Sequence, residues 1–380
     1  MQKIRFDPIL TFVWLILLFL GLSMVFSASS VASLEMTDNN SMYYFFKKQA
    51  VNIIIGMIAA FAIAKISHKK WKPYLLYLNI LTIILLCLVG FTPLGVEING
   101  ATRWLNIGFQ FQPSELAKFT IILTVASMID HARKFGGINS IKNLGKIGIY
   151  VLFYGALIGI PQNHASVVMV IMLFVAMMLF FGGINKLLFF VLFIVAAAAG
   201  LAIALSSEFR RQRIMTFLDP LSDKMGDGYQ ITQNWYALGS GELFGIGLGL
   251  GRQKFGWLPE QNTDFILGVI GEEMGLIGVL FLITLYLFLI ARGVHIAVKS
   301  VDNYGLLLAS GVISVISIQA MINMAVVSGL FPVTGMPLPF ISFGGTTMIV
   351  MCMMVGVLYN VYSTTENEKL VKDEIKGKNE

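Results

Sequence analysis

The most unusual chemistry in this 380-residue sequence lies in LPEQNTDFILGVIGEEMG, residues 258–275, where four carboxylic acids approach and enter an apolar segment. Glu260 and Asp264 lie in its polar first half, and Glu272 and Glu273 lie in the apolar half. A bare carboxylate inside a helical bundle is costly, so such residues are paired, protonated or functional. Asp264 has two interpretations: it is a solvent-accessible general base, or it caps the helix that follows.

A second group of charged residues lies where two outer segments meet apolar parts of the chain. Glu115 and Lys118, in QPSELAK, are three residues apart and therefore share a helix face. They either neutralise each other at the membrane interface or line a polar cavity, and Ser114 is expected to cap their helix. Arg103, in NGATRWLNIG, either contacts a lipid headgroup or binds phosphate oxygens, which a guanidinium group suits well.

The polar residues inside apolar runs have less certain partners. Glu272 and Glu273 point about 100° apart on a helix, so we expect one to face a cavity and the other a neighbouring helix. The residue types do not decide which. Gln319 and Asn323, four residues apart, share a helix face and predict hydrogen bonds between helices. Glu272 and Gln319 are included among the candidate substrate-binding residues.

Three other features predict structure rather than chemistry. His164 follows Pro161 in a short turn and has no second metal ligand beside it, so we expect a turn or packing residue. The glycine-rich GIGLGLG, 245–251, lacks the strand–loop–helix context of a phosphate loop and predicts close backbone packing or a mobile flap. Cys87 and Cys352 lie in apolar runs and are expected to be inert packing residues.

The elements that must position these residues are membrane helices. Hydrophobic residues make up 57% of the chain and charged residues 13%, whereas soluble domains carry about 25% charged residues. Apolar runs of about 18 residues or more predict membrane spans. The sequence therefore predicts an all-α, polytopic integral membrane protein with about ten spans: 8–30, 49–66, 74–91, 115–131, 147–161, 165–181, 187–207, 266–291, 305–330 and 345–362.

We expect residues 1–380 to form one membrane domain, with a large extracytoplasmic loop, 208–265, between the seventh and eighth spans and a tail, 363–380. Lys and Arg, including Lys72, concentrate on the side that carries both termini, so both termini are predicted to be cytoplasmic. The segment 331–344, FPVTGMPLPFISFG, holds three prolines and cannot be one regular helix. It is expected to be irregular backbone around a cavity.

Several long motifs are similar to those of a known family. They are NGATRWLNIGFQFQPSELAKF (99–119), GDGYQITQ (226–233), GIGLGLGRQKFGWLPEQNTDFI (245–266), GEEMGLIG (271–278) and TGMPLPFISFGGTT (334–347). With them the chain resembles the SEDS family of FtsW, RodA and SpoVE, and FtsW and SpoVE more than RodA. The chain departs from the family in PQNHAS, 161–166, where many relatives read Pro-Asp-x-Gly-Thr, and in Asn234, where relatives commonly carry Ser.

The resemblance implies a peptidoglycan glycosyltransferase that polymerises lipid II into glycan strands on the outer face of the cytoplasmic membrane. It implies Asp264 as the catalytic residue and, in the substrate cavity and outer loop, Arg103, Glu115, Lys118, Lys254 and Glu260. It also implies a divalent cation, Mg²⁺ or Mn²⁺, with unassigned ligands. The implied partner is a class B penicillin-binding protein that supplies the transpeptidase.

Elementary chemistry agrees with this reaction. The acceptor hydroxyl must lose a proton, which Asp264 can take, and the pyrophosphate leaving group needs positive charge from Arg103, Lys118 and the cation. Direct displacement on an axial donor would give a β-linkage. Two alternatives remain: a lipid II flippase, because intramembrane charges also suit transport, and a non-catalytic division scaffold. The sequence does not distinguish division, elongation and sporulation.

Overall fold

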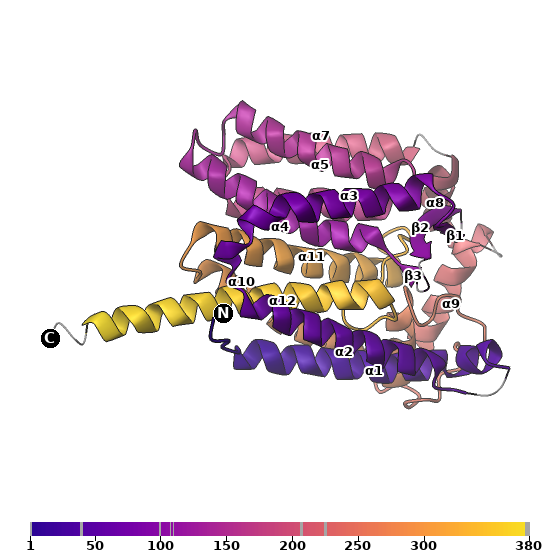
Figure 1. Ribbon diagram of the computed structural model, residues 1–380. Helices are drawn as coiled ribbons and strands as arrows, with labels where there is room; N and C mark the ends of the chain where they lie inside the picture. The colour runs from indigo at the N-terminus through magenta and orange to yellow at the C-terminus, as the bar shows by residue number, and fades with distance from the viewer. Residues whose placement is uncertain are drawn as a thin grey trace.

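The computed structural model describes residues 2–38, 41–98, 100–106, 108, 110–205, 208–223 and 226–376. Ten long helices and two shorter ones account for most of these residues (Figure 1). The long helices are α1 (Pro8–Met36), α2 (Tyr44–Lys65), α3 (Leu75–Phe91), α4 (Pro113–Lys134), α5 (Ile141–Gly159), α6 (Ala165–Phe181), α7 (Lys186–Leu205), α10 (Ile266–Val298), α11 (Asn303–Val327) and α12 (Gly345–Lys376).

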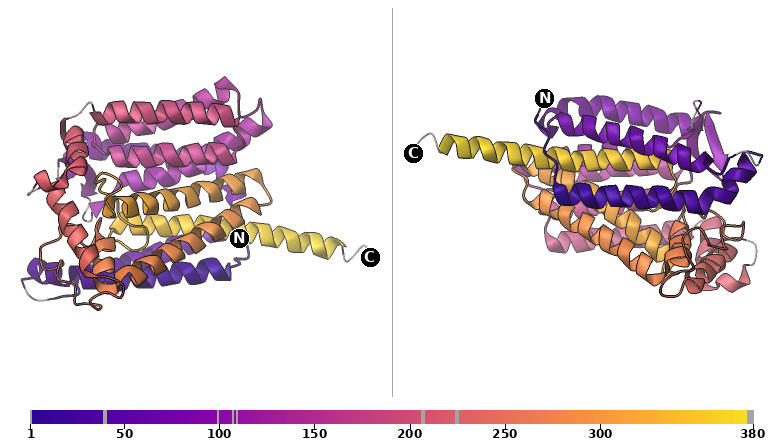
Figure 2. Two further views of the ribbon diagram at one scale, coloured as in Figure 1. Left: turned by 180° about the vertical axis from the view of Figure 1, so that it is seen from behind. Right: turned by 90° about the horizontal axis from the view of Figure 1, so that it is seen from below.

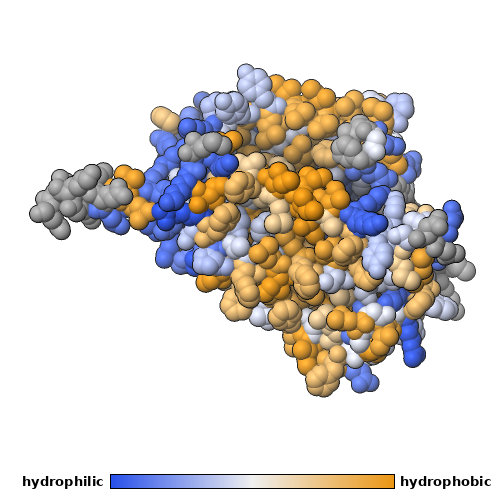
Figure 3. All heavy atoms as spheres, turned by 60° about the horizontal axis from the view of Figure 1, so that its bottom comes forward, coloured by the Kyte–Doolittle hydropathy of each residue, from blue (hydrophilic) through white to orange (hydrophobic). Residues whose placement is uncertain are grey.

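The long helices lie side by side between two ends of the molecule. One end carries the N-terminus and the projecting last part of α12, and we call it the terminal end (Figure 1). The other carries α8 (Glu208–Leu218), α9 (Asp227–Ser240) and a three-stranded sheet, and we call it the loop end. Figure 3 shows apolar side chains over the middle of one face and hydrophilic ones gathered near the C-terminal helix. The chain is a multi-pass membrane protein.

Each of the ten predicted spans contains a helix, but not all of these helices have the length and composition of a membrane span. In the part of the chain that the structure describes, seven helices do: α1, α2, α3, α5, α10, α11 and α12. The last two residues of the seventh predicted span, 206 and 207, lie outside the described residues. The described apolar stretches of α6 and α7 are shorter, and α4 carries charged residues at both of its ends. The count of ten crossings therefore stays a prediction.

α11 and α12 form the centre of the bundle. Most of the apolar length of each is buried, and α11 packs against α10, α6 and α4 while α12 packs along α2 (Figure 2). On α11, Leu307, Leu308, Val312 and Ile316 are fully buried. A helix that is apolar on all sides is expected in such a position, since every side meets another helix.

Prolines mark where two of the helices begin. α1 begins at Pro8, whose fixed φ suits a first helical position, and Asp7 caps it by accepting a backbone N–H of the first turn at 2.8 Å. α4 likewise begins at Pro113, with Gln112 in the cap position. The prediction that Ser114 caps α4 is therefore wrong, because the proline takes the first helical position and moves the cap upstream.

The predicted outer loop, 208–265, is partly helical. It contains α8, the short η3 (Pro220–Ser222) and α9, and residues 241–265 then form turns without regular structure. Two of its residues, 224 and 225, lie outside the described residues. α12 does not end with the predicted span at 362, because it continues as one helix to Lys376. The first part of the predicted tail is therefore helical, and residues 377–380 lie outside the description.

The proline-rich segment 331–344 contains no helix or strand, as predicted, and most of its second half is buried. Side chains from neighbouring helices bind its backbone. Asn323 of α11 donates to the Met336 carbonyl at 2.8 Å, and Gln49 of α2 donates to the Ser342 carbonyl at 3.0 Å. Irregular backbone is tolerated within a membrane protein where protein surrounds it in this way.

α10 is interrupted near its start, and a loop fills the interruption. Gly275 has a φ of +66°, in the left-handed region that favours glycine. Residues 241–256, which we call the strap, lie against this position, and backbone hydrogen bonds join strap residues 242–247 to residues 272–277 of α10 at 2.9–3.1 Å. The strap replaces backbone bonds that the helix loses at its break, so buried polar groups stay paired.

Candidate active site

A small antiparallel sheet carries Arg103 at the loop end (Figure 1). Its strands are β1 (Gly95–Ile98), β2 (Ala101–Asn106) and β3 (Gln110–Phe111), and Arg103 lies on β2, the middle strand. Directly after β3, the backbone N–H of Gln112 donates to the Thr346 hydroxyl at 3.0 Å. This bond joins the sheet to the start of α12 and thereby holds the strand that carries Arg103 in position.

Asp264 lies two residues before the first residue of α10 and does not cap the helix. The cap position belongs to Phe265, and no side chain caps the helix. The backbone around Asp264 is fixed from outside, because Asn323 donates to its carbonyl at 2.7 Å and Ser342 donates to the Thr263 carbonyl at 2.6 Å. Of the two interpretations of Asp264, the structure contradicts the N-cap and leaves a partly exposed carboxyl group.

Arg103 and Asp264 approach each other around Gly335. A Cβ atom placed on Gly335 would lie 3.6 Å from Nη1 of Arg103 and 3.6 Å from Oδ2 of Asp264, so these atoms are no further apart than twice that distance. Nε of Arg103 is buried and has no hydrogen-bond partner in the described chain. The site thus combines a carboxyl group with a guanidinium group that has unused donor capacity.

The surroundings of Asp264 control its charge. Burial raises the pKa of Asp264 to about 7, with a further rise from the charge of Glu260, while Arg103 and Arg213 act in the lowering direction. Burial also lowers the pKa of Arg103, as does the nearby charge of Arg213 on α8. Arg213 therefore belongs to the same cluster, and its Nη1 donates to the Val333 carbonyl at 3.4 Å.

Glu115 and Lys118 form a buried ion pair in the first turns of α4. Nζ of Lys118 lies 2.8 Å from Oε1 of Glu115 and donates to Oε1 of Gln319 on α11 at 3.0 Å. Both charged side chains are almost wholly enclosed, and they neutralise each other as the first interpretation expected. Oε2 of Glu115 accepts no hydrogen bond within the described chain. The predicted interhelical bond of Gln319 is confirmed.

His164 lies close to this pair, a position that its sequence did not predict. Nδ1 of the buried imidazole is 3.4 Å from the Ser114 hydroxyl, at the start of α4. Burial lowers the pKa of His164 well below its usual range, and the charges of Arg103 and Lys118 add to this effect. The ring is therefore neutral, and it lies within reach of the charges of two candidate site residues.

Glu272 and Glu273, further along α10 than Asp264, make hydrogen bonds to neighbouring parts of the protein. Glu272 accepts the backbone N–H groups of Arg252 and Gln253, with a shortest distance of 2.8 Å. Glu273 accepts the Ser27 hydroxyl of α1 at 2.6 Å and pairs with Lys254 at 3.1 Å. One acid does contact a neighbouring helix, as expected. The hydrogen bonds of Glu272 go to the strap, whereas those of Lys254 go to Gly249, Ser27, Glu273 and Gln261. None of these bonds reaches Arg103 or Asp264.

The sequence held one signal that would have identified Arg213. Arg103 attracted attention as a basic residue on the outer side, against the trend of charges in membrane proteins. Arg213 in EFRRQR lies in the outer segment too, so the same argument applies to it. His164 offered no such signal, because its surroundings come from α4 and the sheet rather than from its own turn.

Comparison with known proteins places this arrangement in a family. The profile of the family described as "Cell cycle protein", which comprises FtsW, RodA and SpoVE, matches residues 8–367. "Stage V sporulation protein E" of Bacillus subtilis is 38% identical over 363 residues, 95% of this chain and 98% of that protein. "Probable peptidoglycan glycosyltransferase FtsW" of Geobacter metallireducens is 35% identical, with 94% of each chain covered.

Solved structures share the fold. A chain from a structure reported as "Structural coordination of polymerization and crosslinking by a peptidoglycan synthase complex" aligns with a TM-score of 0.77 at 25% identity, covering 96% of this chain and 99% of that one. The crystal structure of Thermus thermophilus RodA aligns with a TM-score of 0.69 at 25% identity, covering 94% and 97%. From its first helix to the extension of α12, the chain belongs to the FtsW, RodA and SpoVE family of membrane proteins.

Proposed function

We propose that this protein is a peptidoglycan glycosyltransferase that polymerises lipid II at its loop end, on the outer face of the cytoplasmic membrane. The observation that carries the proposal is the partly exposed carboxyl group of Asp264 beside the guanidinium group of Arg103 around Gly335. Relatives named as FtsW peptidoglycan glycosyltransferases support the reaction class. In this orientation both termini face the cytoplasm.

Asp264 acts as the general base in this mechanism. It accepts the proton of the acceptor sugar hydroxyl as that oxygen attacks the anomeric carbon of the donor. A carboxyl group whose pKa is about 7 is a much stronger proton acceptor than an ordinary carboxylate and is still partly ionised at neutral pH. Attack on the face opposite the leaving group inverts the anomeric carbon, so an axial donor gives a β-linkage.

The cationic residues bind the leaving group. Arg103 and Arg213 approach Asp264 from the sheet and from α8, and the charges of Arg103 and Lys118 both act on His164. Fixed positive charge at the place where pyrophosphate leaves stabilises the negative charge that develops there.

A divalent cation fits this site only if the substrate supplies part of its coordination. In the described residues there is no group of three His, Cys, Asp or Glu side chains that could hold a metal ion. Mg²⁺ is commonly bound by one or two carboxylates together with substrate phosphates and water. The exposed Glu260, whose charge acts on Asp264, is the carboxylate we assign to it. The cation would add positive charge beside the pyrophosphate.

The proposed partner is a class B penicillin-binding protein. The solved peptidoglycan synthase complex joins polymerisation and crosslinking, and one of its chains has the fold of this protein over nearly its full length. A transpeptidase beside the loop end would receive each glycan strand as it is made. Co-purification of the two proteins from membranes tests this pairing.

The decisive experiment incubates purified protein with lipid II and Mn²⁺ in the presence of moenomycin. Wild-type protein is expected to produce glycan chains. Asp264→Asn keeps the shape of the side chain, and because Phe265 holds the cap position, helix α10 is unaffected. Loss of general base catalysis costs roughly 10²–10⁴-fold in rate.

Two results would contradict the proposal. Asp264→Asn protein that keeps more than about a tenth of the wild-type rate would remove the base from the mechanism. Wild-type protein that makes no glycan, yet moves lipid II across a vesicle bilayer, would favour the flippase instead. Membrane abundance and the melting temperature of both proteins serve as controls for folding.

A further inference from the structure

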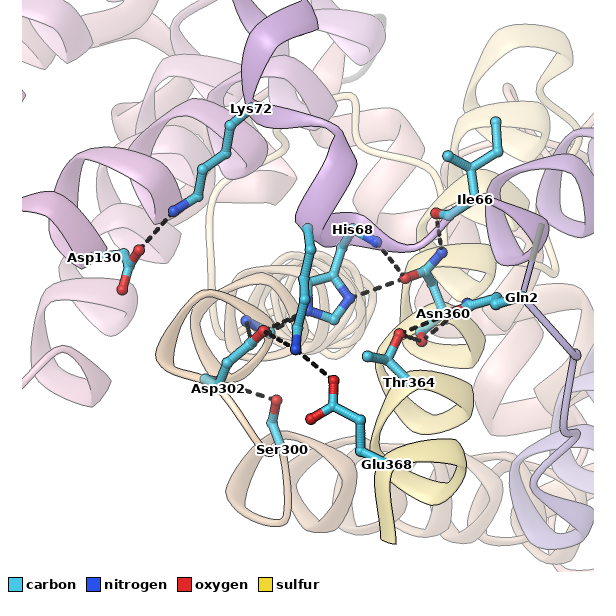
Figure 4. A network of polar contacts seen from close by, with 12 residues as sticks. Gln2, Ile66, His68, Lys72, Asp130, Ser300, Asp302, Asn360, Thr364 and Glu368 are labelled. Carbon is cyan, nitrogen blue, oxygen red and sulfur yellow. Dashed lines mark hydrogen bonds and ion pairs between the residues drawn. The ribbon is translucent and has the colours of Figure 1, made fainter. Parts of the chain in front are cut away.

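A cavity of about 540 Å³ opens at the terminal end, away from the candidate active site. It lies between the link from α2 to α3, the end of α4 and the turn from α10 to α11. The link contains the short helices η1 (His68–Lys70) and η2 (Lys72–Tyr74). The charged residues of the cavity are Lys69, Lys72, Lys134, Asp130 and Asp302. Figure 4 shows several of them around this opening.

Two lysines share one buried carboxylate on the α4 side of the cavity. Asp130 is 2% exposed, and its Oδ2 lies 2.6 Å from Nζ of Lys72 (Figure 4). The same oxygen lies 3.0 Å from Nζ of Lys134. The lysine side chains themselves are 37% and 56% exposed. Each ammonium group has three N–H donors, and one carboxylate oxygen cannot occupy them all. This side of the cavity therefore carries one excess positive charge and free donors.

Asp302, on the opposite side, is already engaged with the protein. It caps α11 by accepting the N–H of Gly305 at 2.6 Å, and it lies 3.1 Å from Nε2 of His68 (Figure 4). Although burial acts to raise the pKa of Asp302, the hydrogen bond and charge of His68 lower it overall. The negative charge of Asp302 is thus compensated locally, and the excess charge of the lysines is not cancelled.

Asn360 fixes the orientation of the His68 ring. Its Nδ1 lies 3.0 Å from Oδ1 of Asn360, whose Nδ2 donates to the Ile63 and Ile66 carbonyls at 2.7 and 2.5 Å. The amide of Asn360 therefore presents only its oxygen to the ring. Both ring nitrogens of His68 therefore face oxygen atoms, Oδ1 of Asn360 on one side and the carboxylate of Asp302 on the other.

The outer flank of the cavity is apolar and accessible. Tyr74, Leu76 and Tyr77, where η2 passes into α3, are between 65% and 70% exposed. Tyrosines at the end of a membrane helix are typical of the headgroup region of a bilayer. A polar cavity with free ammonium donors thus adjoins a surface suited to acyl chains.

We propose that this cavity binds the phosphate group of an anionic phospholipid, with Lys72 and Lys134 donating to its oxygens and the acyl chains lying along α3. Basic pockets between membrane helices are known to select anionic headgroups in this way. Lys72 then does more than orient the chain in the membrane, which was its only predicted role. The proposal is independent of the glycosyltransferase activity, because it concerns the opposite end of the molecule.

The test compares lipid binding by three proteins in detergent. They are the wild type, Lys72→Gln/Lys134→Gln, and a matched control, Lys142→Gln/Lys146→Gln, which removes two exposed lysines of α5 at the same end without touching the cavity. Native mass spectrometry measures retention of phosphatidylglycerol and of phosphatidylethanolamine with identical acyl chains. Inorganic phosphate is added as a competitor in a further series.

We expect wild type and control to retain phosphatidylglycerol in preference to phosphatidylethanolamine, and the cavity double variant to lose that preference. Each lost charged hydrogen bond weakens binding about tenfold or more. Lys134→Gln alone keeps the 2.6 Å bond between Lys72 and Asp130, so it tests the site even if the double variant folds poorly. Equal loss in the control, or no loss in either variant, would overturn the proposal. Displacement of the lipid by millimolar inorganic phosphate would assign the site to a soluble ligand instead.

Discussion

At the scale of single residues, Asp264 differs from the other acids of the loop end in how its charge is controlled. Glu272 and Glu273 are held by hydrogen bonds, whereas burial and the neighbouring charge of Glu260 raise the pKa of Asp264 to about 7. A base works only when it is deprotonated. We therefore expect kcat/KM for lipid II polymerisation to rise about tenfold per pH unit below pH 7 and to level off above it.

Glu260→Gln sharpens this test. Removing the negative neighbour lowers the pKa of Asp264, so the rising part of the pH profile should move to lower pH. Because Glu260 is also the carboxylate assigned to the cation, the plateau itself should fall. The measurement is the rate from pH 5.5 to 8.5 at constant ionic strength and fixed Mn²⁺. A profile that is flat between pH 6 and 8 would mean that Asp264 does not titrate during catalysis.

A test of Lys118 must separate the effect of its charge on catalysis from its effect on folding. Lys118→Met leaves the carboxylate of Glu115 buried without its partner, which costs about 3–5 kcal/mol of stability. Glu115→Gln/Lys118→Met removes both charges and should recover melting temperature and membrane abundance. If Lys118 binds pyrophosphate, this double variant still polymerises lipid II at least about tenfold more slowly than wild type.

The exposed Lys47 on α2 at the loop end provides the control, because Lys47→Met removes a lysine without exposing a buried partner. It should leave the rate unchanged. Recovery of full activity by the Glu115→Gln/Lys118→Met protein would show instead that the pair only holds α4 and α11 together.

The sequence identified most of these residues but not their neighbours. Arg103, Glu115, Lys118 and Asp264 stood out because charge is rare in an apolar chain. Their distances from one another could not be predicted, because they depend on how β2, α4 and the start of α10 pack together. His164 was assigned to packing for the same reason, since its polar neighbour, Ser114, lies 50 residues away in the chain.

At the scale of elements, the packing of the strap predicts that the glycine-rich stretch 245–251 resists replacement. Gly245 has a φ of +80°, and a Cβ atom on it would lie 2.2 Å from the Glu273 carbonyl oxygen. Gly183, between α6 and α7, has a similar φ of +86° but open space around it. Comparing a substitution at Gly183 with one at Gly245 therefore separates the cost of backbone strain from the cost of a steric clash.

We expect Gly183→Ala to cost about 1–2 kcal/mol, the penalty of a left-handed conformation. Gly245→Ala should cost at least about 2 kcal/mol more, because the strap must also give up backbone hydrogen bonds to α10 worth about 1 kcal/mol each. Thermal unfolding in detergent and limited proteolysis at residues 241–256 measure the difference. Equal melting temperatures of the two variants would mean that the strap does not hold the break in α10.

The lengths of the apolar stretches predicted the helices well but did not predict where the helices are interrupted. Every stretch of about 18 apolar residues became a helix, because backbone groups in a bilayer must be paired within the segment. The three prolines of 331–344 correctly predicted irregular backbone. The break at Gly275 gave no such signal, since one glycine in an apolar run is common in membrane helices and the strap that pairs with it lies elsewhere in the sequence.

At the scale of the whole molecule, the distribution of Lys and Arg predicts which end of the bundle faces the cytoplasm. The N-terminus and the end of α12 lie together, and the candidate active site lies at the opposite end (Figure 1). A reporter fused after Gly228, in α9, is expected to report an extracytoplasmic position. One fused after Gly137, in the turn between α4 and α5, is expected to report the cytoplasm. The reverse result would turn the proposed active site away from its substrate.

The contacts of Asn360 also determine when, during synthesis, the first two helices can complete their packing. This residue of α12 holds His68 and the link after α2, yet 292 residues separate it from His68 along the chain. At about 5–20 residues per second, translation leaves the first two helices waiting for tens of seconds before their partner leaves the ribosome. A chain that lacks α12 cannot form these contacts and leaves His68 without Asn360. We therefore expect such a chain to be more sensitive to proteolysis than the full-length protein.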